Sequence, residues 1–160
     1  MAALPRFAAH PAEPAGLFLS FEDVVSECDG GVSAAARLRL LRLFQAVGGA
    51  VAVFSAHGLG DLDRALGLPD LPLIGRKGEE VRLGHDLPTL RSNGLRTLLA
   101  APPFADRPLW LFGLQGAGDD LLAAAARQGG ACASGDAARL ALAGWLDRFA
   151  LPTVGRSALA

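Results

Sequence analysis

The residues best suited to chemistry follow an apolar run near the N-terminus, where residues 17–19 lead into Ser20, Glu22 and Asp23. A serine hydroxyl becomes a nucleophile when a neighbouring base accepts its proton, and Glu22 could serve as that base. The carboxylates of Glu22 and Asp23 could instead hold a hard cation such as Mg²⁺. The plainer alternative, which we favour, is a hydroxyl at the end of a strand beside two solvated loop acids.

A second group of candidates lies further along the chain. Ser55 ends the apolar run 50–54 and could bind phosphate or another anion through its hydroxyl and the following amides. The alternative is a structural role at the end of a strand. His57 could act as a general base, although a surface or capping role is commoner. Arg91 could bind an anion or a partner, or simply lie on a helix surface.

A glycine-rich segment, GLQGAG at 113–118, is the third candidate. It lacks the lysine of a P-loop and the full spacing of a dinucleotide-binding loop, so its likeness to a phosphate loop is superficial. Asp119 and Asp120 follow it. Together with Glu22 they could form a residual metal site, although solvated acids at the start of a helix are the simpler interpretation.

The elements that must position these residues alternate between strands and helices. Expected strands are residues 17–21, 50–55, 71–75, 109–113 and 130–133. Expected helices are residues 34–47 (with Ser33 as the cap), 61–66, 88–100, 119–127 and 136–149, and a small hairpin could run through 81–83. This order predicts a parallel sheet with helices on both faces. Sites in such sheets form beyond the carboxyl ends of the strands, which would bring all the candidates except Arg91 to one edge.

Several segments, in the same order, resemble bacterial trehalose-6-phosphate phosphatases of the haloacid dehalogenase superfamily. The segment LFLSFEDVV at 17–25 is similar to the first motif, an apolar strand followed by D-x-D-G-T. The segment VAVFSAH at 51–57 is similar to the second-motif strand, which ends in S-G-R, and LIGRKGEE at 73–80 is similar to A-G-x-H-G-A-E. The most specific likeness is LRTLLAAPPFADRP at 95–108, which includes the family's P-P-F. The resemblance covers about residues 16–149.

The departures from the family pattern fall on its reactive groups. The family's nucleophilic aspartate falls on Ser20 and its acid/base aspartate on Glu22. The third-motif lysine falls on Arg91, and the two acids of the fourth-motif G-D-D fall on Leu114 and Gln115. The second-motif serine is kept as Ser55. About a dozen residues stand where the family has a substrate-covering cap, so the cap is expected to be absent.

The resemblance implies one Rossmann-like α/β domain with a five-stranded parallel sheet in the order 3-2-1-4-5. We expect this core at residues 16–150, a flexible arm at 1–15 and a tail at 151–160. The lost groups imply a catalytically inactive pseudophosphatase that acts as an interaction, scaffolding or regulatory subunit without a cofactor. Its partner would be a second protein or a second copy of the chain. The expected interface is the uncapped rim of the sheet, with hydrocarbon from Val24, Val25, Leu59 and Leu114.

Two alternatives keep a ligand at the sheet edge. One is a divergent Mg²⁺-dependent phosphatase acting on a sugar phosphate through Glu22, Asp23 and Asp119 or Asp120. The other is a sensor that binds a sugar phosphate at Ser55 and Arg91 without turning it over.

Composition sets the outer bounds. The chain has 160 residues, 51% of them hydrophobic, with a formal net charge of −1. The length suits one domain with a full core, and the charge provides no field that would attract nucleic acid. No apolar run is long enough to span a membrane, and the N-terminus does not read as a signal peptide. We therefore expect a cytoplasmic protein in which Cys28 and Cys132 are reduced thiols.

Overall fold

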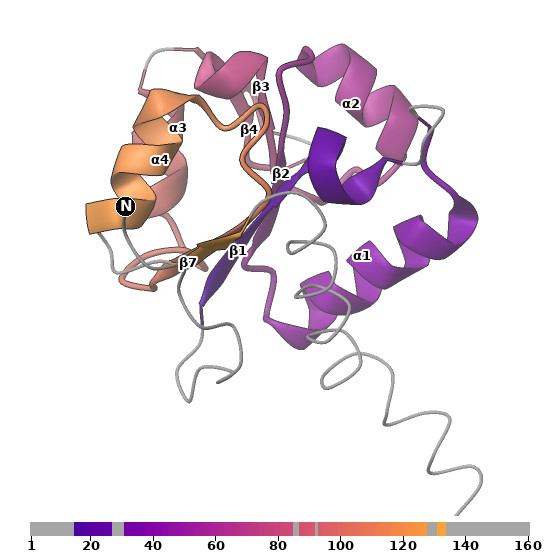
Figure 1. Ribbon diagram of the computed structural model, residues 1–160, viewed down its shortest axis with the longest axis horizontal. Coiled ribbons are helices and arrows are strands. Elements are labelled where there is room, and N and C mark those ends of the chain that lie inside the picture. The colour runs from indigo at the N-terminus through magenta and orange to yellow at the C-terminus, as the bar shows by residue number, and fades with distance from the viewer. Residues whose placement is uncertain (1–14, 27–30, 85–86, 92, 128–130, 134–160) are drawn as a thin grey trace, which may run out of the picture.

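The structure, a computed structural model, describes residues 15–26, 31–84, 87–91, 93–127 and 131–133. Seven strands form one sheet in the order β5-β4-β3-β2-β1-β6-β7 (Figure 1). The strands are β1 (Gly16–Ser20), β2 (Val51–Phe54), β3 (Leu73–Gly75), β4 (Glu80–Arg82), β5 (Thr89–Leu90), β6 (Leu109–Phe112) and β7 (Ala131–Ala133). The helices are α1 (Ala34–Ala46), α2 (Leu59–Leu66), α3 (Gly94–Ala100) and α4 (Gly118–Arg127).

The α/β class is confirmed, but the sheet is mixed rather than purely parallel. Strands β3, β2, β1, β6 and β7 pair in parallel, in the spatial order expected for five parallel strands. Strands β4 and β5 extend this core as antiparallel neighbours. The tight turn Arg76–Gly78 reverses the chain after β3, so that Ile74 pairs with Val81 in the next strand. Such a short connection can join only antiparallel strands.

The predicted helix over 88–100 is wrong in its first half. Thr89 and Leu90 instead form β5 against β4, and α3 begins only at Gly94, after Asn93 in a left-handed conformation (φ 56°). Pairing with the edge of the sheet has overridden the apolar periodicity that predicted a helix.

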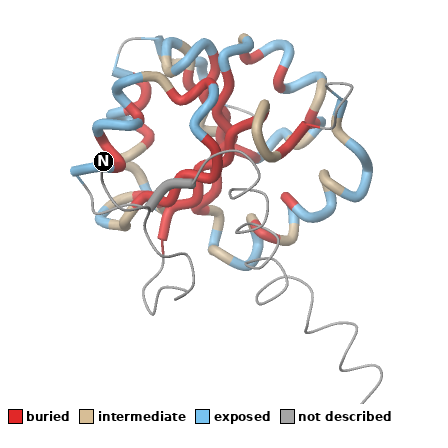
Figure 2. The backbone as a smooth tube through the Cα atoms, in the orientation of Figure 1, coloured by how far each residue is buried: buried red, intermediate tan, exposed pale blue. Residues whose placement is uncertain are grey.

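Helices cover both faces of the sheet, as expected (Figure 1). The residues of β1, β2 and β6 are therefore buried on both sides (Figure 2). Leu17 and Leu19 pack towards α1 and α2, in a cluster that includes Leu43 and Leu62. Phe18, between them in sequence, points the other way and joins a cluster beneath α3 and α4. The alternation follows from the two-residue period of a strand.

Local signals explain where the helices begin and end. The Ser33 side chain accepts a hydrogen bond from the Ala36 amide at 3.1 Å and caps α1, as predicted. Helix α2 ends at Gly67, whose φ of 62° suits glycine. In the part of the chain that the structure describes, no helix has the length and apolar character needed to cross a membrane. The predicted helix at 136–149, the tail, Cys28 and the arm up to residue 14 lie outside the described residues.

Candidate functional site

The carboxyl ends of the parallel strands bring the predicted candidates to one edge of the sheet. Ser20 is the last residue of β1, Ser55 follows β2, Arg76 follows β3 and Gly113 follows β6. The paired registers place Ser20 opposite Phe54, and Leu19 opposite Phe112. The loops after β1, β2 and β6 are therefore neighbours, although they lie far apart in sequence.

The hydroxyl of Ser20 is fully buried and already has partners. It donates a hydrogen bond to the backbone carbonyl of Gln115 at 2.7 Å and accepts one from the Asp23 amide at 3.2 Å. The second contact caps the helical turn Phe21–Val25. Because the proton points at a carbonyl oxygen, which cannot take it up at ordinary pH, this arrangement does not activate Ser20 as a nucleophile.

Glu22 contacts the loop after β2 rather than Ser20. Its Oε2 accepts hydrogen bonds from the Ser55 hydroxyl at 3.0 Å and from the Ala56 amide at 2.9 Å. The Ser55 hydroxyl also accepts one from the His57 amide at 2.9 Å. The donors predicted to bind an anion at Ser55 are thus occupied by a carboxylate of the same chain. The other oxygen, Oε1, is buried without a hydrogen-bond partner among the described residues.

Asp23 makes the matching contact with the loop after β6. Its Oδ2 accepts hydrogen bonds from the amides of Leu114 at 2.9 Å and Gln115 at 3.1 Å. We call this contact and that of Glu22 with Ser55 and Ala56 the two carboxylate clasps. Sequence reasoning singled out both acids but missed this role, because the partners lie 33 to 92 residues away.

The close approach of the loop after β6 depends on glycine. Gly113 has a φ of +95°, and a Cβ atom there would lie 2.5 Å from the Ser20 Cβ and 2.7 Å from the Asp23 Cβ. At Gly116, with a φ of +86°, a Cβ would lie 2.7 Å from the Ala56 amide nitrogen. The glycine-rich segment therefore packs its backbone directly against the loops after β1 and β2, which is the close backbone approach that glycine permits.

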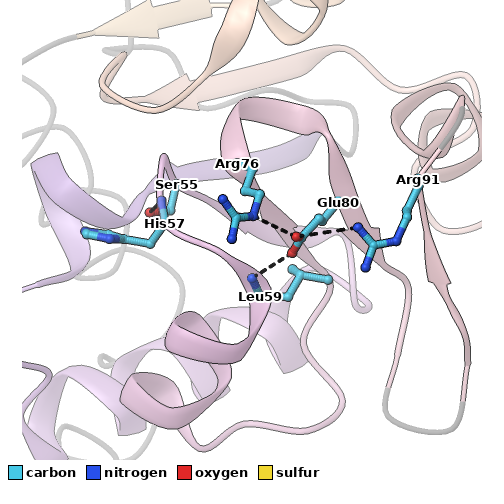
Figure 3. Close-up of polar contacts among 6 residues, drawn as sticks. All are labelled: Ser55, His57, Leu59, Arg76, Glu80 and Arg91. Atoms are coloured by element: carbon cyan, nitrogen blue, oxygen red, sulfur yellow. Dashed lines mark hydrogen bonds and ion pairs between the residues drawn. The ribbon is translucent and has the colours of Figure 1, made fainter.

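A second polar cluster centres on Glu80 (Figure 3). Glu80 accepts hydrogen bonds from the Leu59 amide at 3.0 Å and from Arg76 Nε at 2.8 Å, and Arg91 lies 3.9 Å from the same carboxylate. The amide bond from Leu59, followed by the charges of Arg76 and Arg91, lowers the pKa of Glu80 below 4.5 against the opposing effect of burial. Ser55 and Arg91 lie on opposite sides of Glu80 in this view, so the structure does not join them in one anion site.

The predicted interface residues do not all reach the surface. Val25 and Leu59 are buried in the core, and Val24 is half-buried against the same cluster. The turn after β1 and the start of α2 fold Val25 and Leu59 inward, so these two side chains do not add exposed hydrocarbon to the rim. Leu114 is exposed, as is Leu122, and the two line one hollow of about 580 Å³ at the sheet edge.

His57 is exposed at the same edge. Its ring meets Phe21 edge-on, with centroids 6.2 Å apart, and its carbonyl accepts a hydrogen bond from the Arg76 amide at 2.8 Å. The contacts are those of a loop residue that ties β2 to β3.

The residues at this edge do not fit the magnesium ion that the family resemblance implies. Magnesium requires several oxygen ligands in octahedral array. Here the Leu114 side chain is hydrocarbon, and one oxygen of Asp23 already accepts hydrogen bonds from two amides. Asp119 and Asp120 are exposed in the first turn of α4. Across the described ranges, no group of three or more His, Cys, Asp and Glu side chains is placed to hold a metal.

No model of a known protein family matches the chain, and neither does any curated protein at a significant level.

Proposed function

We propose that this chain is a catalytically inactive, capless pseudophosphatase of the haloacid dehalogenase type that acts as an interaction, scaffolding or regulatory subunit. The observation that carries the proposal is the pair of carboxylate clasps. Glu22 and Asp23, the acids most available for chemistry, are hydrogen-bonded to the loops after β2 and β6. Acids in such contacts hold neighbouring loops together.

The clasps oppose phosphoryl transfer at each required group. A nucleophile must be free to attack, but the Ser20 hydroxyl is buried and donates to a carbonyl. Binding of phosphate oxygens requires free hydrogen-bond donors, but the Ser55 hydroxyl and the Ala56 amide already donate to Glu22. Bringing in a phosphate would place its negative charge beside two carboxylates with no described cluster of metal ligands to offset it.

The interaction role is supported by the exposed hydrocarbon beside the clasps. Leu114 and Leu122 are 37% and 39% exposed, and with Ala117 they line the hollow at the sheet edge. Arg76 and Lys77 border the same hollow. A small apolar centre with a polar rim is the usual make-up of a protein interface. The occupant would be another protein or a second copy of the chain.

The test is hydrolysis of an aryl phosphate and of trehalose 6-phosphate, with and without Mg²⁺, by the wild-type chain and the Glu22→Ala variant. We expect no turnover above a boiled-protein control, and a lower unfolding free energy for Glu22→Ala. Magnesium-dependent turnover that disappears in Glu22→Ala, while stability is unchanged, would show that Glu22 is catalytic and would overturn the proposal.

One observation favours a second candidate, a ligand-binding site at Glu22. The Glu22 Oε1 atom is buried and has no hydrogen-bond partner among the described residues, and an orphaned oxygen of this kind can mark a place for water or an ion. This candidate predicts that a sugar phosphate or Mg²⁺ raises the melting temperature, by RT ln(1 + [L]/Kd) in free energy. Titration of each in a thermal unfolding assay separates it from the interaction role, which predicts no shift.

A further inference from the structure

A groove lies between α3 and α4. The two helices lie on the same face of the sheet, away from α1 and α2 (Figure 1). The groove has a volume of about 1040 Å³ and is open to solvent. Leu99, which is half-buried, and the exposed Ala123 offer hydrocarbon to the groove, and Leu95 and Ala124 are buried beneath it.

Cations outnumber acids along this groove. The basic residues that line it are Lys77, Arg91, Arg96, Arg107 and Arg127, and the acidic ones are Glu79, Asp106 and Asp120. The excess is positive although the whole chain has a net charge of −1. The groove therefore has a local excess of positive charge.

Three of these cations have no partner within the described part of the chain. Lys77, Arg96 and Arg127 are exposed, and none of their side chains makes a hydrogen bond or ion pair with another described residue. Some arginines elsewhere are paired, as in Arg64 with Asp61 at 3.4 Å and Arg82 with Asp63 at 3.0 Å, whereas the Arg39 and Arg42 side chains on α1 also have no partner among the described residues. The groove is thus a place where positive charge is left available.

The cations lie at both ends of the groove. Lys77 lies beside the start of α4. The backbone of Gly118, the first residue of this helix, is packed so closely against the Lys77 carbonyl oxygen that a Cβ atom on Gly118 would clash with it. Arg127 is the last residue of the same helix. A ten-residue helix is about 15 Å long, which exceeds the reach of a single phosphate. An extended peptide covers this distance with about five residues.

We propose that the groove between α3 and α4 docks an acidic, extended segment of a protein partner. Carboxylates of the segment would meet Lys77 at one end and Arg127 at the other, and its apolar side chains would lie on Leu99 and Ala123. The proposal rests on the interaction role proposed above and names the chemistry of the partner. Lys77 and Glu79 line both this groove and the hollow beside Leu114, so the two surfaces are continuous.

The test is binding of a fluorescent octapeptide that alternates glutamate with leucine or alanine, measured by anisotropy with the full chain. We expect a dissociation constant below about 1 mM at low salt, weakened as salt rises. The double variant Arg96→Glu/Arg127→Glu should weaken binding about tenfold or more. The matched control Arg39→Glu/Arg64→Glu reverses two exposed charges on α1 and α2 and should bind like the wild type. A peptide with glutamine in place of glutamate should not bind.

Absence of binding at 1 mM peptide, or equal binding by wild type and Arg96→Glu/Arg127→Glu, overturns the groove proposal. Tighter binding of inorganic tripolyphosphate, with no binding of the acidic peptide, also overturns it and assigns the groove to a small anion. These failures leave the interaction role standing if hydrolysis is absent. Magnesium-dependent hydrolysis, by contrast, removes the proposed function whether or not the peptide binds.

Discussion

The carboxyl edge of the sheet and the groove between α3 and α4 differ in whether their charged side chains have partners within the chain. At the edge, Glu22 and Asp23 are hydrogen-bonded to donors of the chain itself. In the groove, the side chains of Lys77, Arg96 and Arg127 have no partners among the described residues. Charges that a chain pairs internally contribute to its fold, whereas charges left free remain available to another molecule. The comparison separates polar groups that hold the fold together from a surface whose charged side chains have no partner among the described residues.

The strongest challenge to this contrast is to introduce a carboxylate at the end of β1, where the resemblance to haloacid dehalogenase phosphatases would place the nucleophile. Ser20→Asp places a charge at a position with no solvent exposure, facing the Gln115 carbonyl. An unpaired buried charge is costly, so we expect the unfolding free energy to fall by roughly 3 kcal/mol or more. Ser20→Ala, which loses only the hydrogen bonds, should cost about 1 kcal/mol. A stable Ser20→Asp chain with magnesium-dependent turnover would show that the edge is still a working site.

The packing of the edge can be tested at Gly113. Alanine there would combine a φ of +95° with a Cβ only 2.5 Å from that of Ser20. We expect Gly113→Ala to cost about 3 kcal/mol in denaturant-induced unfolding. Gly67→Ala is the control, because its φ is +62° but nothing lies within 4 Å, and it should cost about 1 kcal/mol. Equal costs would mean that backbone conformation, rather than the close approach, sets the requirement for glycine.

The clasp made by Asp23 should contribute less, since its hydrogen bonds to Leu114 and Gln115 lie near solvent. We expect Asp23→Ala to lower the unfolding free energy by about 1–2 kcal/mol, because water can partly replace the lost acceptor. Asp23→Asn keeps one acceptor oxygen and should lose about half as much. If the two variants are both as stable as the wild type, Asp23 is not a clasp.

The Glu80 cluster predicts a pH dependence of stability. Its contacts with Leu59, Arg76 and Arg91 hold the pKa of Glu80 below 4.5 in the folded chain. A depressed folded-state pKa means that the contribution is present above pH 4.5 and is lost as the pH falls through the lower, folded value. Glu80→Gln should therefore melt below the wild type at pH 6, and the difference should shrink in acid. Glu79→Gln, an exposed neighbour, serves as the control, and a gap that is constant from pH 6 to pH 3 would contradict the assignment.

The smallest effect on stability is expected at the exposed rim. Leu114→Ser/Leu122→Ser removes hydrocarbon that is already in contact with water, so unfolding should change by no more than about 0.5 kcal/mol. If the rim is an interface, the same variant should sediment as a smaller species than the wild type, or lose its partner. Unchanged association would place the interface elsewhere.

Much of the fold could be predicted from the sequence, because its signals are local. The apolar runs became β1, β2, β3 and β6 within a residue or two, and Ser33 caps α1 as its position suggested. Strand β5 could not be predicted in this way, because Thr89 and Leu90 are strand residues only by virtue of pairing with β4. The sheet is mixed because β4 and β5, at this edge, pair in the antiparallel direction.

The candidate site was predictable in its membership but not in its contacts. Strand ends gather at one edge of a parallel sheet, so Ser20, Glu22 and Ser55 were placed together correctly. Glu22 accepts a hydrogen bond from Ser55 rather than from Ser20, and this contact depends on three-dimensional packing between residues that are 33 positions apart. The inward turn of Val25 could not be predicted from its neighbours, since it follows Asp23 and Val24 in a segment expected to be a loop. Leu59 did carry a signal, because its helical spacing with Leu62 and Leu66 places it on the buried face of α2.

The most direct test of the central claim, that carboxylates of the chain hold the sheet edge together, is a double-mutant cycle between Glu22 and Ser55. Unfolding free energies of Glu22→Ala, Ser55→Ala and the double variant give the coupling between the two side chains. We predict a coupling of about 1–2 kcal/mol, as expected for a hydrogen bond to a charged group. Costs that simply add, to within about 0.5 kcal/mol, would mean that Glu22 does not clasp the loop after β2 and would contradict the account.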